Sequence, residues 1–340
     1  MKIEQHHLKP LSMGAAMLGS GGGGSTVMQE RILLSVLQQG YEVQLVDIED
    51  LEETDLIVPI AFMGAPLVAQ EKIPSGLEAS ALLEMIRAEY GSVRHIILMP
   101  AEIGGANAFT PLWIGALHGL SVLNADSIGR AFPKLHMSSL NLNGICPTPA
   151  FMADSDGNTH VIRKASALDL EKMARIACVE MGSRALVALY VMDANHAKGA
   201  VVAGSVKKAI EMGQDLIDAK SATAMLVEKW GGKHLASGSI DAIDYRIEGG
   251  FLIGTLSLKR KEGRPLVLRF INEFLTVEDG TEIIAATPDI LSLIEESSGK
   301  IISTADAKWG LRVDVILLPS PAVWKSQAGM ELVGVDQHGF

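Results

Sequence analysis

Four short segments of the 340-residue chain combine glycines with side chains that can bind or activate a small molecule. They read GSGGGGS (19–25), GAPLVAQEK (64–72), PAEIGGANA (100–108) and DSIGRAFPKLH (126–136). A carboxylate can take a proton from water, and an amide or a guanidinium can orient a polar ring. Backbone N–H groups can stabilise developing negative charge. Together the segments predict a small-molecule site with acid–base chemistry.

The expected catalytic groups are carboxylates, with Glu102 first and Glu71 or Asp126 second. The expected substrate-binding groups are the glycine backbone and two polar side chains, namely Gly21, Gly22, Gly23, Gly24, Asn107 and Arg130. Each has an ordinary alternative, because an asparagine here could only cap a helix and an Asp–Arg pair could be purely structural. A glutamate on a surface loop is usually only solvated.

The glycine run places five glycines in six positions, Gly19 and then residues 21–24. Glycine loses more backbone freedom on folding than any other residue, so such a run indicates that something approaches this backbone closely. An anion or a carbonyl oxygen, held by the loop and by the first turn of a helix capped by Ser25 or Thr26, is the preferred interpretation. A flexible turn is the alternative.

The strands and helices that would position these segments can be predicted from the apolar pattern of the sequence. Short apolar runs at 42–48, 55–63, 95–99 and 120–125 alternate with amphipathic stretches, which is typical of parallel βαβ units. In such a sheet ligands bind outside the carboxyl ends of the strands, so loops that follow several strands meet at one edge. We therefore predict an N-terminal α/β domain with a parallel sheet, covering residues 1–163.

The second half of the chain has a different pattern. Residues 166–229 show helical periodicity and no strand is expected there, whereas glycine-punctuated alternation from about 232 onward predicts hairpins. We predict a C-terminal domain over 164–340, a helical segment followed by a β-rich barrel or sandwich. The stretch ADSDGNTH (153–160) is either a hairpin tip or a linker.

Composition restricts the partners and the compartment. The net charge of −11 disfavours nucleic acid, and the sequence has neither a secretory leader nor an apolar run long enough to span a membrane. The two cysteines form no disulfide or zinc pattern, which indicates the cytoplasm. A small molecule is the expected partner, and a second copy of the chain or another enzyme subunit stays open.

Two cofactor hypotheses follow from spacing. Gly19, Gly21 and Gly24 satisfy G-x-G-x-x-G, and Asp47 ends the next apolar run, as in a dinucleotide site. NAD is nevertheless disfavoured, because such a glycine run matches the pattern almost automatically and the preceding LSMGAAM (11–17) is a poor strand. A divalent metal stays open, since carboxylates and histidines are present without tight ligand spacing.

The four segments in this order, extended to LGSGGGG, MGAPLVAQEK, MPAEIGGANA and ADSIGRAFPKLHM, resemble the S-methyl thiohydantoin desulfurase-like family. This family was once labelled a domain of unknown function, and related members are associated with hydantoin utilisation. NEFL (272–275), TPDIL (287–291) and GLRVDVILLP (310–319) resemble its second domain. The resemblance implies an α/β domain with a parallel sheet followed by a β-rich domain. One departure is that Ser25 and Thr26 stand where relatives carry an acidic residue.

The resemblance implies an activity that removes a sulfur substituent from a five-membered thiohydantoin ring. We therefore expect a hydrolase acting on a hydantoin- or thiohydantoin-like cyclic amide, with carboxylate-activated water attacking a ring carbon. The first alternative is a non-catalytic ligand-binding or accessory subunit that works beside a hydantoinase-like partner. The second alternative is an NAD-dependent oxidoreductase.

Overall fold

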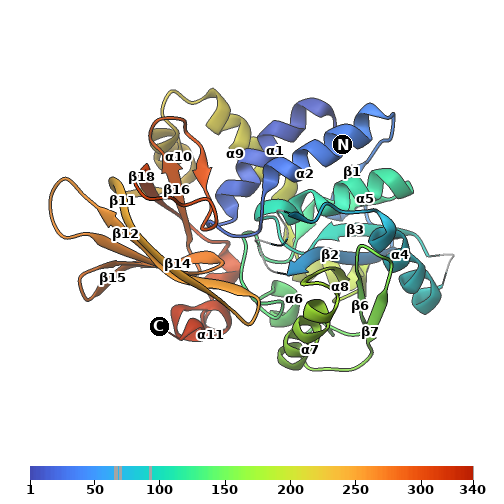
Figure 1. The fold of residues 1–340 in the computed structure, drawn as a ribbon. Helices are drawn as coiled ribbons and strands as arrows, with labels where there is room; N and C mark the ends of the chain where they lie inside the picture. The colour runs from blue at the N-terminus through green and yellow to red at the C-terminus, as the bar shows by residue number, and fades with distance from the viewer. Residues whose placement is uncertain (65–67, 69–70, 92–93, 340) are drawn as a thin grey trace.

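Helices and short apolar strands alternate through the first half of the chain, as expected (Figure 1). The computed structural model describes residues 1–64, 68, 71–91 and 94–339. The helices of the first half are α1 Gln5–Leu18, α2 Thr26–Gln38, α4 Leu77–Tyr90, α5 Thr110–His118 and α6 Ser139–Leu142. Its strands are β1 Leu45–Val46, β2 Leu56–Gly64, β3 Ile96–Pro100, β4 Ser121–Leu123, β5 Ala125–Asp126, β6 Ala150–Ala153 and β7 Thr159–Ile162.

The first sheet has the strand order β1-β4-β3-β2-β8-β6-β7. Its β1, β4, β3 and β2 are parallel, which confirms the predicted α/β architecture, and its remaining strands are antiparallel. Strands β6 and β7 pair directly, so residues 153–160 contain a hairpin tip rather than a linker. The carboxyl ends of β2 and β3 and the chain after β5 lead into the predicted site segments.

The expectation that residues 166–229 contain no strand is wrong. Strand β8 (Arg184–Ala188) is buried throughout and pairs with β2 on one side and β6 on the other. It follows the predicted boundary at residue 163, yet it completes the first sheet. The other elements of this stretch are α7 Ala167–Glu180, β9 Met192–Asp193, α8 Ala194–Ala200, β10 Val202–Ala203, α9 Ser205–Asp218 and α10 Ala222–Trp230.

The C-terminal part is β-rich, as predicted, and forms one antiparallel sheet at the other end of the molecule (Figure 1). Its order is β15-β14-β13-β12-β11-β18-β16-β17. The strands are β11 Lys233–Glu248, β12 Phe251–Lys259, β13 Leu266–Ile271, β14 Glu273–Asp279, β15 Glu282–Ala286, β16 Ile290–Glu295, β17 Ile301–Ile302 and β18 Arg312–Leu318. Strand β14 also packs against β16, so the sheet curls around its own apolar core. Helix α11 (Gln327–Val333) lies near the C-terminus.

Residues 11–17 belong to helix α1, and the glycine run therefore follows a helix rather than a strand. A Cβ atom on Gly14 would lie 1.8 Å from the carbonyl oxygen of Ala209, and one on Gly213 would lie 1.7 Å from that of Pro10. These glycines let α1 and α9 touch backbone to backbone. Because the dinucleotide fingerprint requires a strand before its glycines, the structure removes the basis for the NAD alternative.

In the part of the chain that the structure describes, no helix combines the length and the apolar composition that crossing a bilayer requires.

Candidate functional site

The glycine loop (residues 19–25) is held by hydrogen bonds from both halves of the chain. The Ser20 carbonyl oxygen accepts from the Phe274 N–H at 2.7 Å, and the Gly21 carbonyl oxygen accepts from the Thr304 N–H at 2.8 Å. The Gly23 carbonyl oxygen accepts from the Ala106 N–H at 2.7 Å. The loop is therefore the seam between the first sheet and the C-terminal sheet.

The close approach predicted from these glycines is present, and protein groups make much of it. A Cβ atom on Gly22 would lie 2.1 Å from Oε1 of Glu273, and one on Gly21 would lie 2.5 Å from the Phe274 ring. Gly21 and Gly23 also have positive φ angles, of +83° and +74°. The glycines are thus required by packing and backbone conformation, whatever the loop binds.

Substitution of Gly23 by alanine tests this account against a matched glycine. The new Cβ would lie 2.3 Å from the Gly104 carbonyl oxygen, whereas Gly40, at φ +90°, has nothing within 4 Å of that position. For Gly40→Ala we expect only the left-handed backbone cost, about 1–2 kcal/mol. For Gly23→Ala an added overpacking cost of about 1–3 kcal/mol is expected. Urea unfolding measures both, and equal losses would contradict the packing account.

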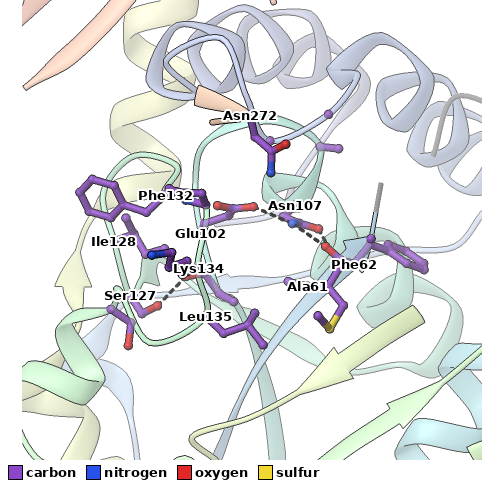
Figure 2. A pocket seen from close by; sticks show the side chains of 18 of the residues that line it. Ala61, Phe62, Glu102, Asn107, Ser127, Ile128, Phe132, Lys134, Leu135 and Asn272 are labelled. Atoms are coloured by element: carbon purple, nitrogen blue, oxygen red, sulfur yellow. Dashed lines mark hydrogen bonds between the residues drawn. The ribbon is translucent and has the colours of Figure 1, made fainter. Parts of the chain in front are cut away.

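A cavity of about 150 Å³ lies beside the glycine loop, where the end of β2 meets the segments that follow β3 and β5 (Figure 2). Its lining includes groups from every predicted segment and from the C-terminal part: Gly23, Gly24, Ser25, Gly64, Glu102, Asn107, Ser127, Phe132, Asn272 and Glu273. Apolar side chains line it too, among them Phe62, Met63, Ile128, Leu135, Leu140 and Leu189. A second cavity, of about 650 Å³, is lined by Gly21 and Gly22 together with Gly23 and Gly24.

Glu102 is the carboxyl group that best suits acid–base chemistry in the first cavity. The Nδ2 atom of Asn107 donates to its Oε1 at 2.7 Å, and the Phe132 N–H donates to the same carboxyl group. Burial raises the pKa of Glu102 to about 7, and the Asp126 charge adds to this rise. The two hydrogen bonds and Arg130 oppose it. Such a group can exchange a proton at neutral pH.

Asn107 positions Glu102 and is largely engaged within the protein. Its Oδ1 accepts from the Phe62 N–H at 2.8 Å, and its Nδ2 donates to the Phe62 carbonyl oxygen at 3.1 Å as well as to Glu102. Figure 2 shows this line of contacts from Phe62 to Glu102. Because the side chain is only 5% exposed and both amide hydrogens have acceptors, it fixes the carboxyl group against the end of β2.

Asp126 and Arg130 lie behind the cavity wall. Oδ2 of Asp126 accepts from the N–H groups of Ile103, Ile128 and Gly129, at 2.9, 3.0 and 2.7 Å. Burial raises its pKa to about 6, although these hydrogen bonds lower it. Within the described residues the two side chains form no ion pair with each other. Asp126 therefore holds the loop that carries Ser127 and Phe132.

Arg130 connects that loop to the C-terminal part. Its side chain is fully buried. Nε donates to the Ala131 carbonyl oxygen at 2.9 Å, while Nη1 donates to those of Pro288 and Asp289 at 2.6 and 2.7 Å. Its guanidinium lies 4.5 Å from the centre of the Phe132 ring. Its positive charge lowers the pKa of Glu102 and the pKa of Glu273.

Glu71 is exposed and does not line either cavity, in contrast to Glu102. The prediction for GAPLVAQEK falls partly on residues 65–67 and 69–70, which lie outside the described residues. For metals, the described residues contain no group of three or more His, Cys, Asp or Glu side chains placed to hold an ion.

The sequence does not predict two of the lining residues, Asn272 and Glu273 of the C-terminal part. Asn272 has a positive φ of +57°, its Oδ1 accepts from the Leu252 N–H at 2.9 Å, and it lies across the cavity from Leu135 (Figure 2). Glu273 is 3% exposed, and its carboxyl group accepts from the Gly23 N–H. The motif NEFL contains both residues, but a glutamate before an apolar strand carries no local sign of burial.

The fold and site define a two-part α/β protein with a cavity that contains buried carboxyl groups and lies where the parts meet. The chain belongs to the S-Me-THD-like family: the model of that family's N-terminal domain matches residues 6–164, and the model of its C-terminal domain matches residues 165–340. The resemblance seen in the sequence is thereby confirmed.

A solved structure shows the same fold. The crystal structure of a protein from Chromobacterium violaceum is similar over 100% of this chain and 96% of that chain, with 26% sequence identity and a TM-score of 0.85. No match is found among curated proteins.

Proposed function

We propose that the chain is a hydrolase of S-alkyl thiohydantoins or related cyclic amides, with Glu102 as the general base. The observation that carries the proposal is the cavity carboxyl group held by Asn107 and the Phe132 N–H, with a pKa of about 7. A general base is most effective when its pKa lies near the working pH. Membership of the S-Me-THD-like family supports this substrate class.

The cavity suits a small flat ring. Apolar side chains such as Ile128 and Leu135 would pack against the ring faces, while Glu102 offers an acceptor at its edge (Figure 2). The first N–H groups of α2, which begins at Thr26, lack partners within the helix. With the adjacent Gly24 they would face negative charge that develops on the ring.

The proposed reaction exchanges a carbon–sulfur bond for a carbon–oxygen bond. Glu102 accepts a proton from water while the water oxygen bonds to the ring carbon that carries sulfur, and a second acid in the cavity protonates the ring nitrogen. The added hydroxyl then returns a proton to that acid as the ring carbonyl forms and the carbon–sulfur bond breaks. Glu102 returns its proton to the departing thiolate. One water is consumed and one thiol is released.

The test is turnover by the purified wild-type protein of S-methyl thiohydantoins and unmodified hydantoins with different side chains. We expect thiol release from the S-methyl compounds, measured with a thiol reagent, in proportion to protein concentration. A thermal-shift measurement follows binding separately, since a ligand of the native state raises the melting temperature.

Binding without turnover, with and without added divalent metal, would contradict the hydrolase proposal and favour an accessory subunit beside a hydantoinase-like enzyme. Absence of both binding and turnover would exclude this ring class altogether. We place the activity in the cytoplasm, because both cysteines, Cys146 and Cys178, are free thiols.

A further inference from the structure

We propose that Glu273 is a second catalytic carboxyl group, supplied by the C-terminal part, which enters the reaction as a neutral acid and protonates the ring nitrogen. The substrate in this inference rests on the proposed function. The state of Glu273 rests on its own contacts and can be measured without any substrate.

The chain directs Glu273 toward the glycine loop. The preceding Asn272 has a left-handed backbone, its Oδ1 accepts from the Leu252 N–H at 2.9 Å, and its carbonyl oxygen accepts from Oγ1 of Thr304 at 2.6 Å. Gly22 leaves the space into which the Glu273 carboxyl group fits. Glu273 therefore reaches the cavity that Glu102 also lines.

The surroundings of Glu273 favour its neutral form. The side chain is 3% exposed, and Oε2 is buried with no hydrogen-bonding partner among the described residues. The donors to its carboxyl group are the Gly23 N–H and its own backbone N–H, both uncharged. An ionised carboxylate buried without an ion pair costs much more free energy than a neutral acid.

The charged groups nearby do not reverse this preference. Arg130 is the cation whose charge lowers the pKa of Glu273. Its Nε and Nη1 atoms donate to three carbonyl oxygens, its Nη2 atom is buried without a partner, and it makes no ion pair with Glu273 among the residues described. The negative charge of Asp289 also stabilises the charged guanidinium of Arg130. Burial comes first in raising the pKa of Glu273 well above its usual range, the Glu102 charge raises it further, and Arg130 lowers it.

The two carboxyl groups complete the proton balance. As water adds to the ring carbon, Glu102 takes a proton from water, the C=N π electrons move to the ring nitrogen, and Glu273 protonates that nitrogen. In the second step the added hydroxyl gives its proton back to Glu273 while the carbonyl forms. The carbon–sulfur bond breaks, and the sulfur takes the proton held by Glu102. Both groups return to their starting states.

The experiment compares Glu273→Gln with wild type and with Glu282→Gln, which removes an exposed carboxylate from β15 of the same sheet. We expect Glu273→Gln to lower kcat for S-methyl thiohydantoin by about 100-fold, with KM within a few-fold of wild type. Infrared difference spectra against wild type at neutral pH should show the loss of a protonated-carboxyl band in Glu273→Gln and no such loss in Glu282→Gln; the part of the band that belongs to Glu102 remains in both variants.

Wild-type kcat in a folded Glu273→Gln, or an infrared band unchanged by that substitution, would overturn the inference. If wild type turns over no ring substrate, the proposed function fails, and the infrared band alone decides whether Glu273 is the neutral acid. If the glutamine variant does not fold, Glu273→Asp serves instead. The infrared band should then persist while kcat falls, because the side chain is one methylene group shorter and holds its carboxyl group farther from the ring nitrogen.

Discussion

Replacement of Glu102 by glutamine is expected to lower kcat by about 10²- to 10⁴-fold, the usual contribution of a positioned general base. Glutamine keeps the size of the side chain and an oxygen that can accept from Asn107, but it cannot take a proton from water. Circular dichroism and thermal melting should therefore report a folded protein. Steady-state assays with S-methyl thiohydantoin measure the loss.

The same group sets the pH dependence. Because burial raises the pKa of Glu102 to about 7, the carboxyl group is mostly protonated below that pH and cannot act as a base. Wild-type kcat/KM should accordingly rise with pH through about 7, whereas the residual rate of Glu102→Gln should lack this step. Glu282→Gln provides the matched control. Unchanged turnover in a folded Glu102→Gln would remove Glu102 from the chemistry.

Replacement of Arg130 by methionine should lower the free energy of unfolding by about 3–5 kcal/mol, because three carbonyl oxygens lose their charged donor and each buried acceptor left unpaired costs about 1–3 kcal/mol. The fully buried guanidinium donates to the carbonyl oxygens of Ala131, Pro288 and Asp289. Methionine fills much of the volume but leaves these acceptors unpaired, and it removes the positive charge that lowers the pKa of Glu102 and of Glu273. Equilibrium urea unfolding is the measurement.

Two further variants separate the causes. Arg130→Lys keeps the positive charge without the fork of N–H donors, so its stability should lie between wild type and Arg130→Met. Arg163→Met removes an exposed partner of Glu89 and should change stability by only about 0–1 kcal/mol. An Arg130→Met variant as stable as Arg163→Met would show that this guanidinium does not join the two parts of the molecule.

The apolar runs of the first half predicted the strands that carry the site. Runs 55–63 and 95–99 became β2 (Leu56–Gly64) and β3 (Ile96–Pro100) almost residue for residue, because continuous apolar runs identify strands buried on both faces. Parallel order then brings the following loops to one edge. Glu102 and Asn107 could therefore be predicted as cavity residues from local pattern and topology alone.

The remaining features depend on contacts between distant segments. Gly14 looks like an interruption, yet it is where α9 touches α1, and β8 is a five-residue run that cannot be distinguished from the adjoining helical pattern by period alone. The burial of the Glu273 carboxyl group depends on its contacts with Gly22 and Gly23, which lie about 250 residues earlier in the chain and give no local signal beside Glu273. The sequence around Arg130 does not show that its guanidinium donates to carbonyl oxygens 158 and 159 residues away, which occupy donors that could otherwise bind substrate.

The position of β8 has a consequence for synthesis on the ribosome. Strands β2 and β6 emerge first, but neither can pair with the other in the native sheet, because β8 lies between them. Until residue 188 has left the exit tunnel, the edges of β2 and β6 that pair with β8 in the native sheet stay unpaired, and unpaired apolar edges favour association between nascent chains. A polypeptide ending at the family boundary, residue 164, would keep those edges permanently. A polypeptide that continues through β8 covers both edges once that strand joins the sheet.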